Sequence, residues 1–352
     1  MTKVYVGMSG GVDSSVTAAL LVQQGHDVTG VYMKNWSQDL PGMVCPWKDD
    51  YQDAKRVAVQ LGIPFKMYDF ETEYRQRVVD YMLDGYKRGI TPNPDIMCNQ
   101  EVKFKLFLDT ALTDGADMIA TGHYARVANG ELLTAANVDK DQTYFLYRVT
   151  EEALRRSLMP IGDYATKEEV RAIARQFDLA TATKKDSQGI CFVGKVGIRD
   201  FLLHELGPQL SGAIIDQNGV TIGEHDGAIF YTIGQRQGLG IGGGLPYYVI
   251  GKDMAKNEVY VTTNLDDSSL WRKELICTQT HWINQPPEPG KTYQVRTRYR
   301  ADLVDCELLE VEPIGTEKGV KIALSTEVRA ITPGQSAVLY DGDHVVGGGI
   351  VL

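Results

Sequence analysis

Near the start of the chain stands the stretch Lys3-Val-Tyr-Val-Gly-Met-Ser-Gly-Gly-Val-Asp-Ser-Ser15. Its first apolar and β-branched residues, Val4 to Val6, predict a buried strand. The strand pattern breaks at Ser9-Gly10-Gly11, and a helical pattern then runs from about Ser14 through Leu21. The stretch therefore predicts a strand, a glycine turn and the N-terminus of a helix, in that order.

This order of elements is suited to binding a phosphate group. The first turn of a helix has backbone N–H groups without intrahelical partners, and its dipole favours negative charge. Gly10 and Gly11 let the backbone bend with positive φ and come close to a ligand. Ser9, Ser14 and Ser15 add hydroxyl donors. The alternative is an ordinary tight turn, but six defined positions between a strand and a helix favour nucleotide binding.

Composition narrows the class of protein. The 352 residues are 43% hydrophobic and 23% charged, which is ordinary for a globular chain of two or three domains. No apolar run reaches the ~20 residues of a membrane span and no signal pattern is present, so we expect a cytoplasmic location. The net charge of −10 argues against indiscriminate nucleic-acid binding, but not against RNA on a local basic face.

The order of strand and helix patterns predicts the fold class. The first ~120 residues alternate the two, which predicts an α/β domain with a Rossmann-like parallel sheet. Its ligands are expected at the carboxyl ends of the strands, where Ser9, Met33 and Gly122 meet on one rim. The pattern from Glu151 to about Phe177 is helical, and Thr166-Lys-Glu-Glu169 is a capping-box signature.

After about residue 207 the pattern changes to short strands and frequent glycines. This change predicts a small β-rich domain followed by a C-terminal β-barrel. We therefore expect an α/β domain over 1–206, a central β-rich domain over 207–273 and a barrel over 274–352.

The five cysteines are odd in number and have no Cys-x-x-Cys spacing, so they predict neither a disulfide framework nor a zinc site. Cys98, at the N-terminus of a predicted helix, and Cys191, after a polar turn, are candidates for chemistry. Cys277 and Cys306 alternate with apolar residues in predicted strands, which indicates packing. Cys45 follows Gly42-Met-Val in a predicted loop and carries no strong prediction.

Six motifs follow one another along the chain: Ser9-Gly-Gly-Val-Asp-Ser-Ser15, Asn93-Pro-Asp95 with Cys98-Asn99, Gly122-His-Tyr124, Lys140-Asp-Gln142, Gly189-Ile-Cys191-Phe192 and Tyr231-Thr-Ile-Gly-Gln-Arg236. Together they resemble the tRNA-specific 2-thiouridylases, whose first domain is that of the N-type ATP pyrophosphatases. The resemblance covers the chain from end to end. The loop around Cys45-Pro-Trp47 matches least well.

The resemblance implies an enzyme that transfers sulfur to the wobble uridine of tRNA. ATP, with Mg²⁺ on its phosphates, would adenylate the uracil C2 oxygen. Cys191 would carry a persulfide, whose terminal sulfur or released sulfide attacks C2. Cys98 would attack Cys191 and leave a disulfide, and Asp95 would be the acid or base. The implied nucleotide-binding residues are Gly7, Met8, Ser9, Gly10, Gly11, Val12, Asp13, Ser14, Met33 and Gly122.

The resemblance also implies partners. They are tRNA, a sulfur donor that is a cysteine desulfurase or a sulfur-relay protein, and a reductant for the Cys98–Cys191 disulfide. Independently, Arg296, Arg298 and Arg300 alternate in a predicted strand and would share one face, suited to phosphates. The residues expected to contact tRNA are Asn93, Pro94, Asp95, His123, Lys140, Asp141, Gln142, Arg298, Tyr299, Arg300 and Gln335.

Two other functions remain open from the residues alone. One is an ATP pyrophosphatase that acts on a small metabolite, for which the pair Cys98 and Cys191 would have no role. The other is a non-catalytic RNA-binding or thiol-redox module that keeps the glycine loop as scaffold. It predicts no pyrophosphate release from ATP and tRNA.

Overall fold

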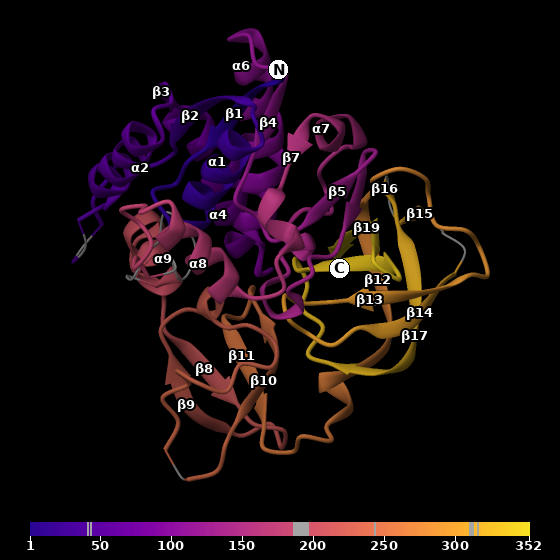
Figure 1. Cartoon of the computed structure of the whole chain (residues 1–352). Helices are drawn as coiled ribbons and strands as arrows, with labels where there is room; N and C mark the ends of the chain where they lie inside the picture. The colour runs from indigo at the N-terminus through magenta and orange to yellow at the C-terminus, as the bar shows by residue number, and fades with distance from the viewer. Residues whose placement is uncertain (41, 43, 186–196, 243, 310–312, 315–316) are drawn as a thin grey trace.

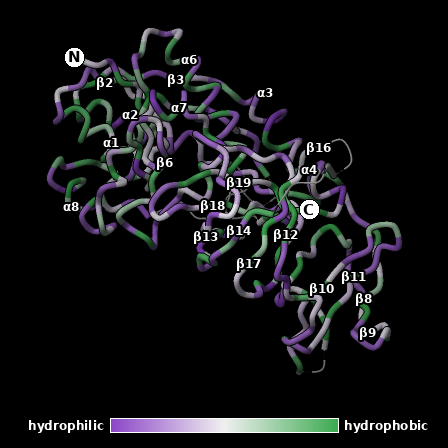
Figure 2. Tube along the Cα trace, turned by 90° about the vertical axis from the view of Figure 1, so that its right-hand side faces the viewer, coloured by the Kyte–Doolittle hydropathy of each residue, from purple (hydrophilic) through white to green (hydrophobic). Residues whose placement is uncertain are grey.

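The computed structural model describes residues 1–40, 42, 44–185, 197–242, 244–309, 313–314 and 317–352. The described chain forms three parts: an α/β part, a small β part and a C-terminal barrel that lies beside both (Figure 1). Hydrophobic segments occur in each part (Figure 2), and the core around Tyr5 and Phe107 also includes Val338 and Tyr340 of the barrel. Among the described residues, no helix is long and apolar enough to cross a membrane.

The first part is built on a five-stranded sheet of order β3-β2-β1-β4-β7, in which every neighbouring pair is parallel. The strands are β1 (Lys3–Gly7), β2 (Asp27–Lys34), β3 (Phe65–Asp69), β4 (Met118–Ala120) and β7 (Ser157–Leu158). The chain adds β2 and β3 on one side of β1 and then returns to place β4 on the other side. The carboxyl ends of β1 and β4 therefore form a topological switch point, where such sheets bind ligands.

Alternate side chains of β1 enter two different cores, as the period of a strand requires. Val4 and Val6 pack with Leu20 in one core, whereas Tyr5 packs with Phe107 in the other. Helices thus cover both faces of the sheet, and the predicted α/β class is confirmed. The helices of this part are α1 (Val12–Gln23), α2 (Trp47–Leu61), α3 (Glu71–Tyr74), α4 (Asp80–Lys87), α5 (Pro94–Met97), α6 (Phe107–Thr113), α7 (Glu151–Arg155), α8 (Lys167–Gln176) and α9 (Ile198–Leu206).

Two helices contain π-helical segments. Segment η1 (Arg75–Val79) joins α3 to α4, and η2 (Cys98–Leu106) joins α5 to α6. Short 3₁₀ turns complete this part: η3 (Val138–Lys140), η4 (Thr143–Phe145) and η5 (Pro160–Asp163).

The helical prediction from Glu151 to Phe177 is wrong in its middle, because β7 interrupts it. That strand has two residues, too few to leave a period in the sequence. The capping box is confirmed: Glu169 N–H donates to Thr166 Oγ1 at 3.2 Å, and Thr166 N–H donates to Glu169 Oε2 at 2.8 Å.

The central part is a four-stranded sheet of order β10-β11-β8-β9. Its strands are β8 (Gly212–Ile215), β9 (Thr221–His225), β10 (Tyr248–Asp253) and β11 (Glu258–Thr262), with the 3₁₀ turn η6 (Ala228–Phe230). A small core around Ile214, Val249 and Val261 holds it together. The 3₁₀ turn η7 (Ser268–Leu270) leads into the barrel.

Six antiparallel strands close the predicted C-terminal barrel, because β12 pairs with both β17 and β19. They are β12 (Trp271–Trp282), β13 (Thr292–Arg296), β14 (Val304–Leu309), β17 (Val320–Arg329), β18 (Ser336–Asp341) and β19 (His344–Val351). The hairpin β5 (Arg126–Ala128) and β6 (Glu131–Leu133) of the first part extends this sheet at β19. A short pair, β15 (Pro313–Ile314) and β16 (Glu317–Lys318), lies outside the barrel order. We keep 1–206, 207–273 and 274–352 as proposed domain bounds.

Candidate active site

The glycine loop is held in shape by bonds to the start of α1. Ser9 N–H donates to Ser14 Oγ at 3.1 Å, and Ser15 Oγ donates to the Gly11 carbonyl at 2.8 Å. Gly11, which has no side chain, occupies the N-cap of α1, so no cap competes with a ligand for the first N–H groups. Gly10 has φ +74°, and a Cβ there would lie 2.3 Å from the Asp50 carbonyl oxygen of α2. The loop is therefore packed tightly against α2, while the first N–H groups of α1 remain available to an anion.

The carboxyl end of β4 packs directly on this loop. A Cβ on Gly122 would lie 2.7 Å from Ser14 N and 2.9 Å from the Asp13 carbonyl carbon. At the carboxyl end of β1, a Cβ on Gly7 would lie 3.0 Å from Cε of Met33, which belongs to the neighbouring strand β2. The expected rim of Ser9, Met33 and Gly122 thus follows from the parallel sheet, with glycine wherever backbones approach closely.

A lysine that the sequence analysis missed lies on the loop. Lys167 Nζ, from the first turn of α8, is 2.6 Å and 2.8 Å from the two carboxylate oxygens of Asp13. Tyr124 OH donates to the same carboxylate at 3.1 Å. The chain positions of Asp13 and Lys167 differ by 154 residues, so no local pattern could pair them. Lys167 brings an ammonium group to a loop that has no lysine of its own.

The segment before Cys98 begins a helix earlier than expected. Asn93 is the N-cap of α5, and its Oδ1 accepts from Ile96 N–H at 3.3 Å, with Pro94 in the first helical position. Cys98 therefore lies in the second turn, and η2 and α6 continue the helix to Thr113. The prediction that Cys98 lies at the N-terminus of a helix is wrong, because the helix begins four residues earlier, at Pro94. Cys98 is 4% exposed.

Two titratable groups near this segment are shifted by burial. Burial raises the pKa of the half-buried Asp95, and the charge of Lys103 opposes that rise. Burial lowers the pKa of His123 well below its usual value, and Lys103 adds to the shift. Lys103 Nζ lies 3.3 Å from His123 Nε2, and an ammonium can only donate. His123 is therefore neutral, with its Nδ1 proton directed to Thr121 Oγ1 at 2.8 Å.

The segment 140–142 is tied to the protein interior. The buried Asp141 accepts from Ala135 N–H at 2.7 Å and from Thr143 N–H at 3.1 Å. Gln142 Oε1 accepts from Tyr124 N–H at 2.9 Å. Lys140 is half-buried and follows the cap Asn137. Asp141 and Gln142 thus shape the segment, and their contact with RNA stays a prediction.

The predicted arginine row is wrong as a strand. β13 ends at Arg296, and Arg300 has φ +62°, so the chain turns there instead of continuing. Arg296 lies over the Tyr340 ring at 5.4 Å, whereas Arg298 and Arg300 are exposed. Tyr299 packs on Phe145 with the rings tilted by 46° and their centroids 4.5 Å apart. The three guanidinium groups do not share one strand face.

The remaining cysteines differ in environment. Cys277 and Cys306 are 0% and 2% exposed in the barrel core, where burial raises each pKa to about 12, so their predicted packing role is confirmed. Burial also raises the pKa of the half-buried Cys45. Cys191 and its motif lie outside the described residues. Just before them, Lys184 Nζ binds Asp50 at 2.7 Å and Asp53 at 2.8 Å, beside the glycine loop.

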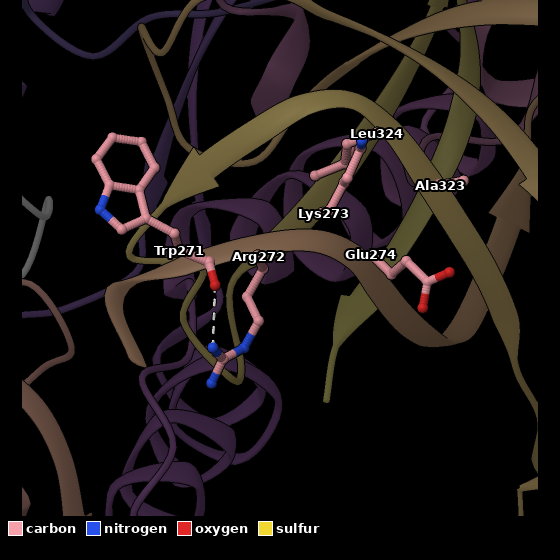
Figure 3. Close-up of a pocket in the computed structure, with 6 residues that line it drawn as sticks. All are labelled: Trp271, Arg272, Lys273, Glu274, Ala323 and Leu324. Carbon is pink, nitrogen blue, oxygen red and sulfur yellow. Dashed lines mark hydrogen bonds between the residues drawn. The ribbon is translucent and has the colours of Figure 1, made fainter. Parts of the chain in front are cut away.

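A pocket lies away from these residues, where β12 and β17 lose register. Figure 3 shows the guanidinium of Arg272 bonded to the Trp271 carbonyl, at 3.0 Å. Glu274 pairs with Lys321 at 2.7 Å. The lining consists of Trp271, Arg272, Lys273, Glu274, Ala323 and Leu324. None of the predicted site residues lines this pocket, so it is not the candidate site.

The fold and the loop at the switch point define a nucleotide-binding α/β enzyme. Three family models match the chain in order: a tRNA methyl transferase HUP domain over residues 2–195, a tRNA methyl transferase PRC-barrel domain over 199–263 and an aminomethyltransferase beta-barrel domain over 272–351. Relatives named tRNA-specific 2-thiouridylase MnmA match over 99% of this chain. They include that of Oceanobacillus iheyensis, 46% identical and covered to 95%, and that of Lacticaseibacillus paracasei, 48% identical and covered to 94%.

The protein of the same name from Bacillus subtilis is 45% identical over 99% of this chain and 95% of its own length. The chain therefore belongs to the tRNA-specific 2-thiouridylase family, and the resemblance inferred from the six motifs is confirmed. It is a sulfurtransferase of the ATP pyrophosphatase type, which uses ATP. A solved NMN synthetase from Francisella tularensis covers 53% of this chain and 66% of its own, at 15% identity and a TM-score of 0.32, which adds nothing to this assignment.

Proposed function

We propose that this chain activates the C2 oxygen of the wobble uridine of tRNA with ATP and then replaces that oxygen with sulfur. The products are 2-thiouridine, AMP and pyrophosphate. The observation that supports this most is the glycine loop at the switch point. There the backbone lies so close to Gly10 and to Gly122 that neither position has room for a Cβ. A member of this family with such a loop has the means to hold a triphosphate.

In the activation step, the uracil C2 oxygen attacks the α-phosphate and expels pyrophosphate. AMP then becomes the leaving group at C2, whereas the unactivated C2 oxygen would not depart. The proposed contacts are the α1 N-terminus and residues Gly7 to Ser14 for the phosphates, with Met33 and Gly122 beside the nucleotide. Lys167 suits this step because its ammonium group lies on Asp13 of the loop proposed to bind the phosphates, and an ammonium pairs well with phosphate oxygens.

Mg²⁺ is proposed as the companion of ATP. Among the described residues there is no group of three or more His, Cys, Asp or Glu that could hold a metal. Mg²⁺ commonly binds through substrate phosphates, waters and one or two carboxylates, and Asp13 is the carboxylate of the loop. When bound, the ion would offset charge on the departing pyrophosphate.

In the sulfur step, we propose that a desulfurase or relay protein loads Cys191 with a persulfide. The Cys98 thiolate attacks Cys191 Sγ, which forms the Cys98–Cys191 disulfide and releases hydrosulfide. Hydrosulfide attacks C2 and expels AMP; alternatively the persulfide attacks C2 first. In both routes a cellular thiol reductant supplies two electrons to restore the two cysteines. Asp95 would exchange a proton with the base, and burial, which raises the pKa of its carboxyl, favours that role.

The target base would leave the anticodon stack and enter beside Asn93-Pro-Asp95. Proline at positions 92 and 94 makes this loop stiff, and the Asn93 cap orders it further. The other proposed tRNA contacts are His123, Lys140, Asp141, Gln142, Arg298, Tyr299, Arg300 and Gln335.

One assay tests the proposal. The full chain is incubated with ATP, Mg²⁺, a persulfide donor, a reductant and unmodified tRNA, and nucleosides are measured by mass. We expect 2-thiouridine at the wobble position, with one pyrophosphate released per thiolation. Asp95→Asn should slow thiolation at least tenfold without changing ATP affinity, and Cys98→Ser should abolish turnover. Absence of product, in parallel with a thiouridylase that succeeds, would refute the proposal.

A further inference from the structure

All three parts of the chain meet at one residue, Thr91. Its N–H donates to the Pro333 carbonyl at 2.9 Å, and its carbonyl accepts from Gln335 Nε2 at 2.8 Å, both in the barrel. Its hydroxyl lies 3.1 Å from the hydroxyl of Thr232 in the central part. Thr91 itself belongs to the first part, between α4 and α5. Every polar group of this one residue is thus bonded to another part of the molecule.

Neighbouring backbone packs closely against Thr91 and the residue after it. Gly334 has φ +90°, and a Cβ there would lie 2.9 Å from the N, C and O atoms of Thr91. On the opposite side, a Cβ on Gly85 of α4 would lie 2.8 Å from Pro92 Cγ. One glycine therefore lets the barrel approach Thr91, and another lets α4 approach the next residue, Pro92.

The central part presents Thr232 from the motif Tyr231-Thr-Ile-Gly-Gln-Arg236, which the proposed chemistry does not use. Thr232 N–H donates to Gln235 Oε1 at 3.0 Å, and Lys252 Nζ donates to the Tyr231 carbonyl at 2.7 Å. A Cβ on Gly234 would lie 2.5 Å from Ala330 Cβ of the barrel. The motif therefore fixes the Thr232 hydroxyl and seats the central part against the barrel.

We propose that Thr91 is a positioning residue for sulfur transfer, and that the hydroxyl pair of Thr91 and Thr232 sets the place of Asn93-Pro-Asp95. This inference rests on the proposed function, which gives Asp95 and Cys98 their roles. Thr91 precedes Asn93 by two residues and Asp95 by four. The central part and the barrel both bond to Thr91, on the N-terminal side of the loop. Both parts therefore help to position the loop.

The residues between Thr91 and Asp95 are rigid, so a displacement of Thr91 also displaces Asp95. Pro92 and Pro94 are both buried, and proline fixes φ near −65° and restricts the residue before it. Asn93 lies between them with its side chain bonded to Ile96 N–H. A shift at Thr91 therefore reaches Asp95 and the helix that carries Cys98.

The test compares Thr91→Val, which removes the hydroxyl and keeps the shape, with Thr91→Ser, which keeps the hydroxyl. We expect Thr91→Val to lower kcat for thiolation about three- to tenfold, the range of one neutral hydrogen bond. KM for ATP should stay at the wild-type value, the thermal midpoint should fall by only about 2–4 °C, and Thr91→Ser should restore kcat to within twofold. Because the two hydroxyls act as a pair, Thr91→Val/Thr232→Val should lose no more than the worse single variant.

Thr221→Val, at an exposed position of β9, is the matched control and should keep full kcat. Full kcat in Thr91→Val, or a loss that follows the thermal midpoint and is not rescued by serine, would overturn the inference. Full additivity in the double variant would also overturn it. If Cys98→Ser keeps turnover, the proposed function has failed instead, so the two failures are distinguishable.

Discussion

Gly122→Ala is the substitution that most directly perturbs the nucleotide site. The new methyl group would lie 2.7 Å from Ser14 N and 3.0 Å from Ser14 Cα. Ordinary contact begins at 3.4 Å, so the methyl is about 0.7 Å too close. The obstructing atoms are backbone at the start of α1 and have no rotamer with which to yield. The end of β4 and the glycine loop must therefore move apart.

The expected cost has two parts. Overpacking of this kind destabilises by about 1–3 kcal/mol, which for a domain of 150–250 residues lowers the thermal midpoint by about 2–4 °C per kcal/mol. A shift of several tenths of an ångström also misplaces the N–H groups that would bind phosphate, so we expect ATP affinity to fall at least tenfold. Calorimetric titration with ATP and urea unfolding measure the two effects on the same sample.

Gly223→Ala is the control, because the nearest atom to its Cβ is 3.8 Å away. Gly7→Ala is an intermediate case, since the atom it meets at 3.0 Å is the flexible end of Met33. We expect ATP affinity to decrease in the order Gly223→Ala, Gly7→Ala, Gly122→Ala. If Gly122→Ala binds ATP within twofold of wild type and unfolds at the same urea concentration, the close approach of β4 to α1 does not form the site.

Three further outcomes are expected. Lys167→Met should slow pyrophosphate release at least tenfold yet change stability by no more than about 1 kcal/mol, because its pair with Asp13 is partly exposed; Lys256→Met, in an exposed pair, is the control. His123 is kept neutral in the fold, so the unfolded chain alone takes up its proton below pH ~6.5 and stability falls by up to about 1.4 kcal/mol per pH unit as the pH decreases further. His123→Gln should flatten that slope in urea titrations, and an unchanged slope would contradict the assignment. Cys277 and Cys306 should resist iodoacetamide at pH 8 until urea unfolds the barrel, because a pKa of about 12 leaves roughly one thiolate in ten thousand.

Local patterns in the sequence were sufficient for the features that depend on neighbouring residues. The strand, glycine turn and helix at residues 3–21 follow from side-chain period and glycine freedom, and so does the capping box at Thr166. The shared rim of Ser9, Met33 and Gly122 needed one further step, the rule that parallel strands end on the same edge. The packing role of Cys277 and Cys306 came from simple alternation.

Features that depend on distant residues had no such signal. The Asp13–Lys167 pair joins positions 154 apart, and β7 is held by its neighbour β4 and not by its own two residues. The arginine row was mispredicted because the alternation in the sequence continues to Arg300, past the end of β13 at Arg296. The tertiary position of Thr91 left no trace in a polar, proline-rich loop. In each case the missing information was the geometry that brings separate parts of the chain together.

The two halves of the proposed reaction therefore make different demands on the chain. ATP activation needs rigidity, which the parallel sheet and the close glycine contacts supply within one domain. Sulfur transfer needs a large substrate and two cysteines 93 positions apart in the sequence to be arranged together. Thr91 connects these demands, since it ties the loop before Asp95 to both β-rich parts. On this view the additional domains take part in organising the reaction centre, in addition to enlarging the surface for RNA.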